Sequence, residues 1–432
     1  MFLKTKTKES IMKNFLIFFL FVLSGIITAQ NINGRFSSSL YSFERVDSAD
    51  VSKNHLRAYQ MLNLNLNYGD VSIRSYLNFE NDFAQDLKDD PRLRFYNLYL
   101  EARNIMDIAT LKLGRQPIIN SVVGGLMDGV SLSLRKYNFQ LSGFYGGNVP
   151  AYQKFELIEN FSDNYIAGGK LTTTLIKNLR LGVGYLNKNF KPLDYKALRL
   201  DPELNPIEVL IQNKSNQFQF ITGEASYYLP SEFSIDVRYD YDLNFKQTSK
   251  IEFDARVEHI KDAGINLYYS YREPKIRYNS IFSVFDYGNT EEIEIGTDIK
   301  INENFTVLGN LGIVNYQDDN SSRVGIGLAT RVGTFNYKKT FGYAGELDAI
   351  SGYSAYTLAD GLITPSAGFS YTTYKLTPDA EKNSLTTILV GLNFRPFRKL
   401  SFDIQGQYMD NKIYKDDFRL LFKLNHWFNL NL

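Results

Sequence analysis

Side chains that commonly carry catalysis are scarce in this sequence. It holds three histidines, His55, His259 and His426, and no cysteine, which excludes thiolate nucleophiles and zinc–thiolate sites. His259 stands in VEHIKD, close to an expected turn, a setting typical of a histidine at a rim rather than of a catalytic base. We therefore expect no catalytic residue, no bound metal and no cofactor, and we predict that the protein is not an enzyme.

Three short segments resemble functional motifs but lack the context that those motifs require. SGYSAY, at residues 351–356, has no second glycine and no strand-to-helix turn, so it does not predict a nucleophile elbow. GIGLAT, at residues 325–330, lies inside a strand pattern and not between a strand and a helix, which excludes a nucleotide loop. YQDDN, at residues 316–320, lacks the oxygen spacing of a calcium loop, and we interpret it as a solvated loop.

Ionisable side chains instead recur at every second position. In FSIDVRYDYDLNF, residues 233–245, the odd positions are apolar or aromatic and the even positions are polar. Strict alternation predicts a β-strand with one apolar face and one hydrated face, and a charged face of this kind interacts with water and ions. The charged members of this face and of the next segment are Asp236, Arg238, Asp240, Asp242, Asp254 and Arg256.

The same alternation runs along the whole chain. Clear examples are LNLNLNY at 62–68, VSIRSYLNF at 71–79, RFYNLYLEAR at 94–103, INLYYSYR at 265–272, RVGIGLATR at 323–331 and LSFDIQGQY at 400–408. No amphipathic helix longer than a turn or two is evident. Counting these segments predicts about 18 to 22 strands, an even number. Residues 278–285 and 369–376 are ambiguous between a strand and an external loop.

The connections between these segments come in two sizes that tend to alternate. Short ones stand at 68–70, 103–107, 135–138, 229–232, 302–304 and 395–399, and long polar ones at 44–54, 81–91, 150–163, 187–216 and 345–365. Short turns at one end and long loops at the other are typical of outer-membrane barrels.

Which face of each strand is inside depends on the surroundings. In a secreted β-sandwich array, the alternative fold, the apolar face is the core. In an outer-membrane barrel the apolar face meets lipid and the polar face lines the lumen. Aromatic residues make up 15% of the chain, the face parity never reverses, and a sheet in lipid must close. We therefore predict an all-β fold, a single closed antiparallel transmembrane β-barrel.

Residues 1–29 have the pattern of a secretory signal peptide. Four lysines precede the apolar run FLIFFLFVLSGII at residues 15–27, and Ala29 precedes the expected cleavage. This run is shorter than the about 20 residues of a spanning helix, which argues against an N-terminal membrane anchor. The expected organisation is a signal peptide at 1–29 and a barrel at 30–432.

The last segment, FRLLFKLNHWFNLNL at residues 418–432, alternates to the final residue. This resembles the C-terminal strand that the outer-membrane insertion machinery reads. Two departures are Leu432, where that class usually ends in phenylalanine, and His426, which interrupts the apolar face.

The segment LKLGRQPIINSVVGGLMDGVSLSL, residues 111–134, resembles a hairpin of porin-type outer-membrane barrels, and most closely of the alginate-export type. The matching residues are Gly114, Arg115, Gln116, Asp128, Gly129 and Val130. The resemblance implies a barrel whose arginine-rich lumen passes anionic sugars. A structural role is the alternative, in which Arg115 pairs with Asp128 at the rim and stabilises the loop.

These patterns predict a channel for passive diffusion of small polar or charged solutes, including sugars, in the outer membrane of a Gram-negative bacterium. The alternatives are a barrel-embedded hydrolase that uses His259, and a receptor or anchor barrel without an open pore. Expected partners are outer-membrane lipid and lipopolysaccharide, the insertion machinery and small polar solutes. A net charge of +1 gives no reason to expect nucleic acid.

The charges also predict how the pore is lined. The expected pore-lining residues are Arg74, Arg103, Lys112, Arg115, Asp236, Arg238, Asp240, Asp242, Asp254 and Arg256. More broadly, the inward positions are basic in the early strands and acidic in the middle ones. The basic set is Arg57, Arg74, Arg103, Lys112, Arg135, Lys170 and Arg180, and the acidic set is Asp236, Asp240, Asp242, Glu252, Asp254, Glu258, Glu292, Glu294 and Asp298. Walls of opposite sign would place a transverse field across the lumen.

Overall fold

The computed structural model describes residues 30–48, 51–85, 92–119, 122–150, 158, 160–190, 195–200, 202–211, 216–258, 262–285, 287–316, 319–342, 347–375, 377, 379–412 and 415–432. The expected signal peptide and His259 lie outside these residues. Within them, no helix is both long enough and apolar enough to cross a lipid bilayer.

The described residues form strands and two short 3-10 helices. The first strands are β1 (Asn31–Ser48), β2 (Val51–Tyr68), β3 (Val71–Asp82), β4 (Arg92–Ile105), β5 (Ala109–Ile118), β6 (Gly125–Lys136), β7 (Phe139–Val149), β8 (Tyr165–Thr173), β9 (Leu179–Lys188), β10 (Tyr195–Leu200), β11 (Pro206–Ile211) and β12 (Phe218–Leu229). The remaining elements are β13 (Phe233–Asp242), β14 (Gln247–Val257), β15 (Ala263–Arg272), η1 (Ile281–Val284), β16 (Thr290–Asn302), β17 (Phe305–Tyr316), β18 (Asp319–Thr330), β19 (Gly333–Gly342), β20 (Leu347–Ala355), η2 (Ala359–Gly361), β21 (Ile363–Tyr374), β22 (Asn383–Phe397), β23 (Leu400–Asn411) and β24 (Asp417–Asn431).

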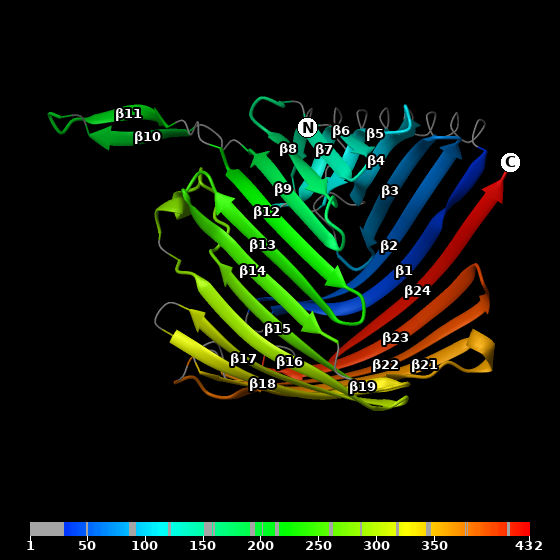
Figure 1. The fold of residues 1–432 in the computed structure, drawn as a ribbon. Helices are drawn as coiled ribbons and strands as arrows, with labels where there is room; N and C mark the ends of the chain where they lie inside the picture. The colour runs from blue at the N-terminus through cyan, green and yellow to red at the C-terminus, as the bar shows by residue number, and fades with distance from the viewer. Residues whose placement is uncertain are drawn as a thin grey trace.

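A single sheet of 22 strands closes on itself as a barrel (Figure 1). The closure is the pairing of β1 with both β2 and β24, which sets Asn31 opposite Asn67 on one side and opposite Asn431 on the other. Each strand pairs antiparallel with the next along the wall, β9 pairing with β12. The predicted closed antiparallel barrel is confirmed, with the strand number at the upper end of the expected range.

Two strands stand outside the barrel. β10 and β11 form a separate two-stranded hairpin in the connection between β9 and β12, and it projects away from the barrel at the upper left of Figure 1. Of the two ambiguous segments, 369–376 belongs mostly to β21, whereas 278–285 is a loop that contains η1.

The two ends of the barrel differ, although two of the predicted long loops are wrong: β1 and β2 extend through most of 44–54, and β20 lies within 345–365. Turns such as Gly69–Asp70 between β2 and β3 are short, and the start of β1 and the end of β24 lie at this end, since Asn31 pairs with both Asn67 and Asn431. The opposite end carries the β5–β6 loop (119–124), the β7–β8 loop (150–164), the β9–β12 connection (189–217) and the β15–β16 loop (273–289).

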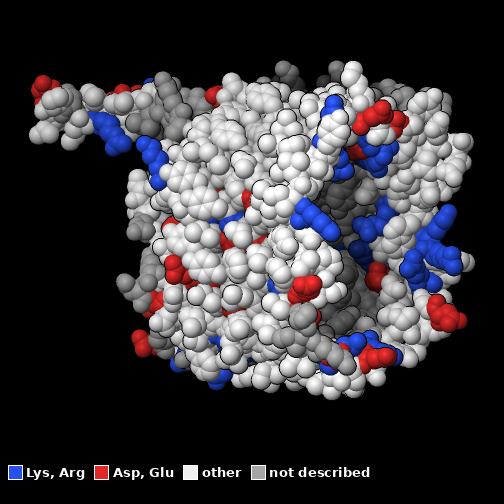
Figure 2. All heavy atoms as spheres, in the orientation of Figure 1, with Lys and Arg blue, Asp and Glu red and all other residues white. Residues whose placement is uncertain are grey.

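Alternation places apolar side chains on the outer face. On β13, Val237 and Tyr239 expose 38% and 42% of their surface. Asp240, on the inner face of the same strand, is fully buried. Exposed apolar side chains recur on the other strands, among them Leu113, Val183, Ile293, Leu311, Ile326, Val390, Ile404 and Phe422. Figure 2 shows the wall on the viewer's side as mostly uncharged, with Lys and Arg gathered around the hollow on its right. An apolar outer band is what lipid requires.

Asparagines join the two ends of the barrel sheet at the short-turn end. Asn31 Nδ2 donates to Oδ1 of Asn429 at 2.7 Å and of Asn431 at 2.6 Å. Asn33 donates to Asn31 at 2.6 Å, and Asn65 donates to Asn33 at 2.9 Å. An amide both donates and accepts, so this network crosses the β24–β1–β2 seam without adding charge.

Candidate functional site

The inner face of β13 carries both structural and hydrated charges. Arg238 Nε donates to Asp240 Oδ1 at 3.1 Å, and Thr222 Oγ1 donates to the same oxygen at 2.8 Å. Asp242 accepts from the backbone N–H of Asn244 at 2.8 Å, in the turn that leads to β14. Asp240 and Asp242 are therefore held in the wall and offer little charge to a passing solute.

Asp236 and Asp254 differ from these two acids. They face each other across the β13–β14 pairing and both are exposed. Among the described residues, neither has a hydrogen-bond or ion-pair partner. Like charges directly opposite each other repel, and hydration lowers that cost, so these two carboxylates form an acidic patch that water can reach.

Ion pairs on the inner face bridge strands that are not neighbours. Arg256 of β14 donates from Nη1 to Oδ1 of Asp298 of β16 at 2.8 Å, although β15 lies between them. Gly264 of β15 provides the space for this ion pair, because a Cβ there would lie 2.5 Å from Arg256 Nη2 and 2.7 Å from Asp298 Oδ1. Similar bridges join Lys170 to Glu224 and Arg323 to Glu292. These bridges neutralise much of the charge that lines β8 to β18.

Three of the predicted pore-lining cations share one carboxylate. Arg74, Arg103 and Lys112 lie 3.8, 3.5 and 3.9 Å from the carboxylate oxygens of Glu101. The Lys112 ammonium also stands 5.3 Å from the centre of the Tyr99 ring. One negative charge among three positive ones leaves this part of β3 to β5 with a net positive potential.

Arg115 lies in a different setting from the other predicted pore-lining residues. Its Nε and Nη2 donate to the two carboxylate oxygens of Asp128 at 2.7 and 2.8 Å, and each side chain is only 4% exposed. Asp128 also accepts from the backbone N–H of Ile158 in the β7–β8 loop. Arg115 shares the strand parity of Leu113, an exposed outer-face residue. The geometry is that of the structural alternative, a buried bidentate pair that fixes a loop, and this guanidinium does not line the lumen.

The β5–β6 loop folds across part of the interior. Val122 is 7% exposed and packs against Phe218 and Phe220 of β12, which is separated from β6 along the wall by three strands. Lys188 of β9 donates from Nζ to the Gly124 carbonyl at 3.0 Å. Contacts with β9 and β12 thus hold this loop against the inner face of the wall.

The β15–β16 loop also contacts the β5–β6 loop. Lys275 Nζ donates to the Val122 carbonyl at 2.5 Å, and Asn279 Nδ2 donates to the Phe190 carbonyl at 3.3 Å. Burial lowers the pKa of the Lys275 ammonium, and the nearby charge of Asp240 partly opposes this shift. Loops from three connections therefore meet inside one end of the barrel.

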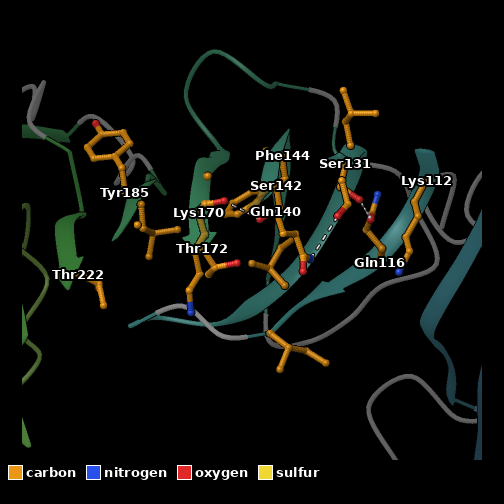
Figure 3. Close-up of a pocket in the computed structure, with 18 of the residues that line it drawn as sticks. Lys112, Gln116, Ser131, Gln140, Ser142, Phe144, Lys170, Thr172, Tyr185 and Thr222 are labelled. Atoms are coloured by element: carbon orange, nitrogen blue, oxygen red, sulfur yellow. Dashed lines mark hydrogen bonds between the residues drawn. The ribbon is translucent and has the colours of Figure 1, made fainter. Parts of the chain in front are cut away.

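A hollow of about 250 Å³ lies on the inner wall next to the β5–β6 loop (Figure 3). We call it the cationic hollow, and its polar lining includes Lys112, Gln116, Ser131, Ser133, Gln140, Ser142, Lys170, Thr172, Arg180, Thr222 and Glu224. Ser131 donates to Gln116 Oε1 at 2.6 Å, a bond that holds the amide against the wall. Hydroxyls, amides and a cation excess can replace the water around a small polar or anionic solute.

The two described histidines take no part in this hollow. His55 Nδ1 lies 2.6 Å from Asp82 Oδ2, buried on the inner face and stacked on Phe43. His426 is exposed on β24 next to Phe428. In the part of the chain that the structure describes, no group of three or more His, Asp or Glu side chains could hold a metal ion.

Sequence reasoning missed the inward loops. Val122 and Lys275 lie in connections for which the sequence analysis predicted no contacts, and Lys188 lies in the long polar connection predicted at 187–216. One signal was available: PIINSVVGGLM at 117–127 is an apolar connection in a barrel whose other loops are polar. Apolar loop residues need a surface to pack on.

Comparisons with known proteins give one partial family match. A family model described as "LptD: LPS transport system D" matches residues 203–305, less than half of the chain. No curated protein matches the sequence.

Three solved structures are similar over most of the chain. OccAB1 of Acinetobacter baumannii has 9% identity and a TM-score of 0.45, and the match covers 93% of this chain and 96% of that one. OpdL of Pseudomonas aeruginosa has 11% identity and a TM-score of 0.43, over 93% and 99%. A BenF-like porin from Pseudomonas fluorescens Pf-5 has 10% identity and a TM-score of 0.42, over 93% and 98%. At these scores the likeness carries no argument about substrate, and it gives no support to a specific alginate-export relationship.

Proposed function

We propose that this protein is an outer-membrane channel through which small polar or charged solutes, sugars among them, diffuse passively. The observation that carries the proposal is the closed barrel with an apolar outer face and an inner face of ion pairs, hydroxyls and amides. Such a wall is stable in lipid only as a spanning barrel, and its interior holds water. The inward loops leave a narrowed path lined by the cationic hollow.

The proposal includes the protein's location and partners. The chain reaches the outer membrane of a Gram-negative bacterium after removal of residues 1–29, and its last strand is read by the insertion machinery. Phospholipid and lipopolysaccharide surround the outer face. The alginate-export-type hairpin at 111–134 remains a proposed resemblance, and the buried Arg115–Asp128 pair supports a structural role for it.

Planar-bilayer recording tests the channel directly. Purified, folded protein should give single-channel current steps in potassium chloride, since a hydrated lumen conducts ions. The absence of steps from protein that is demonstrably folded and inserted would contradict the channel.

That absence would favour the second candidate, a receptor or anchor barrel. The observation that favours such a barrel is the inward packing of the β5–β6 and β15–β16 loops, which occupies part of the lumen. The hydrolase alternative depends on His259, and lipid hydrolysis that is lost in His259→Ala would be required to sustain it.

A further inference from the structure

A second hollow, of about 370 Å³, lies on the inner wall formed by β15 to β19. We call it the amide hollow. Its inward-facing lining consists of Asn266, Tyr268, Glu294, Gly296, Asp298, Leu308, Asn310, Gly325, Gly327, Asn336 and Lys338. The volume is in the range of small-molecule sites.

The registers of these strands alternate amides with glycines. One row across the wall runs Asn266, Gly296, Asn310, Gly325 and Lys338. In this row the Asn310 amide lies over Gly325, where a Cβ would come 1.9 Å from Asn310 Oδ1. In the next row Asn336 lies over Gly327 in the same way, with a distance of 2.6 Å. The missing side chains thus create the depression and hold the two amides at its surface.

These two amides are available to a ligand. Among the described residues, neither Asn310 nor Asn336 has a hydrogen-bond partner. The acids of the hollow are engaged, since Asp298 pairs with Arg256 and Glu294 lies 3.9 Å from Arg323. The two amides therefore offer neutral donors and acceptors, and Lys338 at the end of the first row adds a positive charge beside them.

We propose that the amide hollow binds an uncharged, polyhydroxylated ring such as a monosaccharide. A hydroxyl group donates and accepts, and so does an amide, so the two complement each other without desolvating an ion. The Tyr268 ring and Leu308 supply apolar surface for the C–H face of a sugar. This inference rests on the proposed channel function and names one class of its substrates.

The cationic hollow provides the contrast. It carries Lys112, Lys170 and Arg180 and should prefer an anionic solute. Glucuronate carries a carboxylate where glucose carries a hydroxymethyl group, so comparing the binding of the two sugars distinguishes the two hollows. The affinity for glucose should depend on the amide hollow, and the affinity for glucuronate should depend more on the cationic hollow.

The test is a saturation-transfer NMR titration of detergent-solubilised, full-length protein with glucose. Asn310→Ala combined with Asn336→Ala should weaken glucose affinity by about tenfold, because two neutral hydrogen bonds are lost. Gly325→Ala should weaken it as well, since the added Cβ displaces the Asn310 amide while both amides remain. Asn315→Ala, which removes an exposed amide on the outer face of the same strand as Asn310, is the matched control and should leave glucose affinity unchanged.

Conductance in potassium chloride is measured on the same samples. Conducting wild-type protein that does not bind glucose would overturn the amide hollow and leave the channel standing. Equal glucose affinity in wild type and in the double variant would also overturn it. Glucose binding by protein that does not conduct would instead overturn the channel, and normal conductance of each variant shows that it has folded.

Discussion

At the scale of single residues, neighbours on β13 face different media. Val237 shares the exposed apolar outer face, and Asp236 lies in the acidic patch on the inner face. Val237→Arg should destabilise the barrel in bilayers by about 2–4 kcal/mol, the cost of a cation on the lipid face near the midplane. Asp236→Ala, the matched control, should fold like wild type. Refolding with and without detergent, followed by circular dichroism, is the measurement.

The detergent dependence separates the barrel from a soluble sandwich. A sandwich would also suffer from Val237→Arg, but it would fold in plain buffer. Complete folding of the wild type without detergent or lipid would contradict the membrane assignment.

Arg238 is the inner-face residue whose loss should matter. From the alternation alone, Arg238→Ala should fold and at most change ion preference. The structure changes this expectation, because Arg238 is a partner of the fully buried Asp240. Among the described residues this leaves Thr222 as the hydrogen-bond donor to that carboxylate, and the loss should cost about 1–3 kcal/mol. Urea unfolding in detergent should show a lower midpoint for Arg238→Ala than for Asp236→Ala, and equal midpoints would contradict the structural role.

At the scale of elements, the β5–β6 loop is held by a few specific bonds. Lys275→Met keeps most of the side-chain length but removes the donor to the Val122 carbonyl. Losing a hydrogen bond from a charged donor costs about 1.5–3 kcal/mol, enough to raise the population of a released loop at least about tenfold. Single-channel recording should show higher mean conductance and more current noise. Lys196→Met, in the projecting β10–β11 hairpin, should behave like wild type, and an unchanged Lys275→Met trace would mean that the loop does not control the path.

The strands were predictable and the loops were not, for a physical reason. Alternation along 233–245 reflects the lipid on one side of the wall and the water on the other. Local sequence is therefore enough to predict the strand, its inner face and the barrel class. The partners of Val122 and Lys275 stand on strands and loops far along the chain, and no local pattern identifies them. The asparagines of LNLNLNY are visible in the sequence, but their connection through Asn31 to Asn429 and Asn431 follows only from barrel closure.

At the scale of the whole molecule, the charge of the lumen is uneven around its circumference. Cations exceed acids around Glu101, whereas Asp236 and Asp254 leave an acidic patch on β13 and β14. Between these arcs, bridges such as Arg256 to Asp298 cancel charge locally. A net charge of +1 on the chain adds no strong field of either sign. The lumen therefore presents both signs to a passing solute, one on each arc.

This distribution predicts weak ion selectivity with a defined origin. In a salt gradient, wild-type channels should show a reversal potential close to zero, because ions of either sign find a favourable arc. Asp236→Asn combined with Asp254→Asn removes the acidic patch and should change the permeability ratio by about twofold toward anions, since local potentials of this kind reach several kT. Asp107→Asn, on an exposed short turn outside the lumen, is the control. Strong anion selectivity in the wild type, or an unmoved reversal potential in the double variant, would mean that ions do not pass along β13 and β14. Strong cation selectivity would contradict the predicted balance of the two arcs.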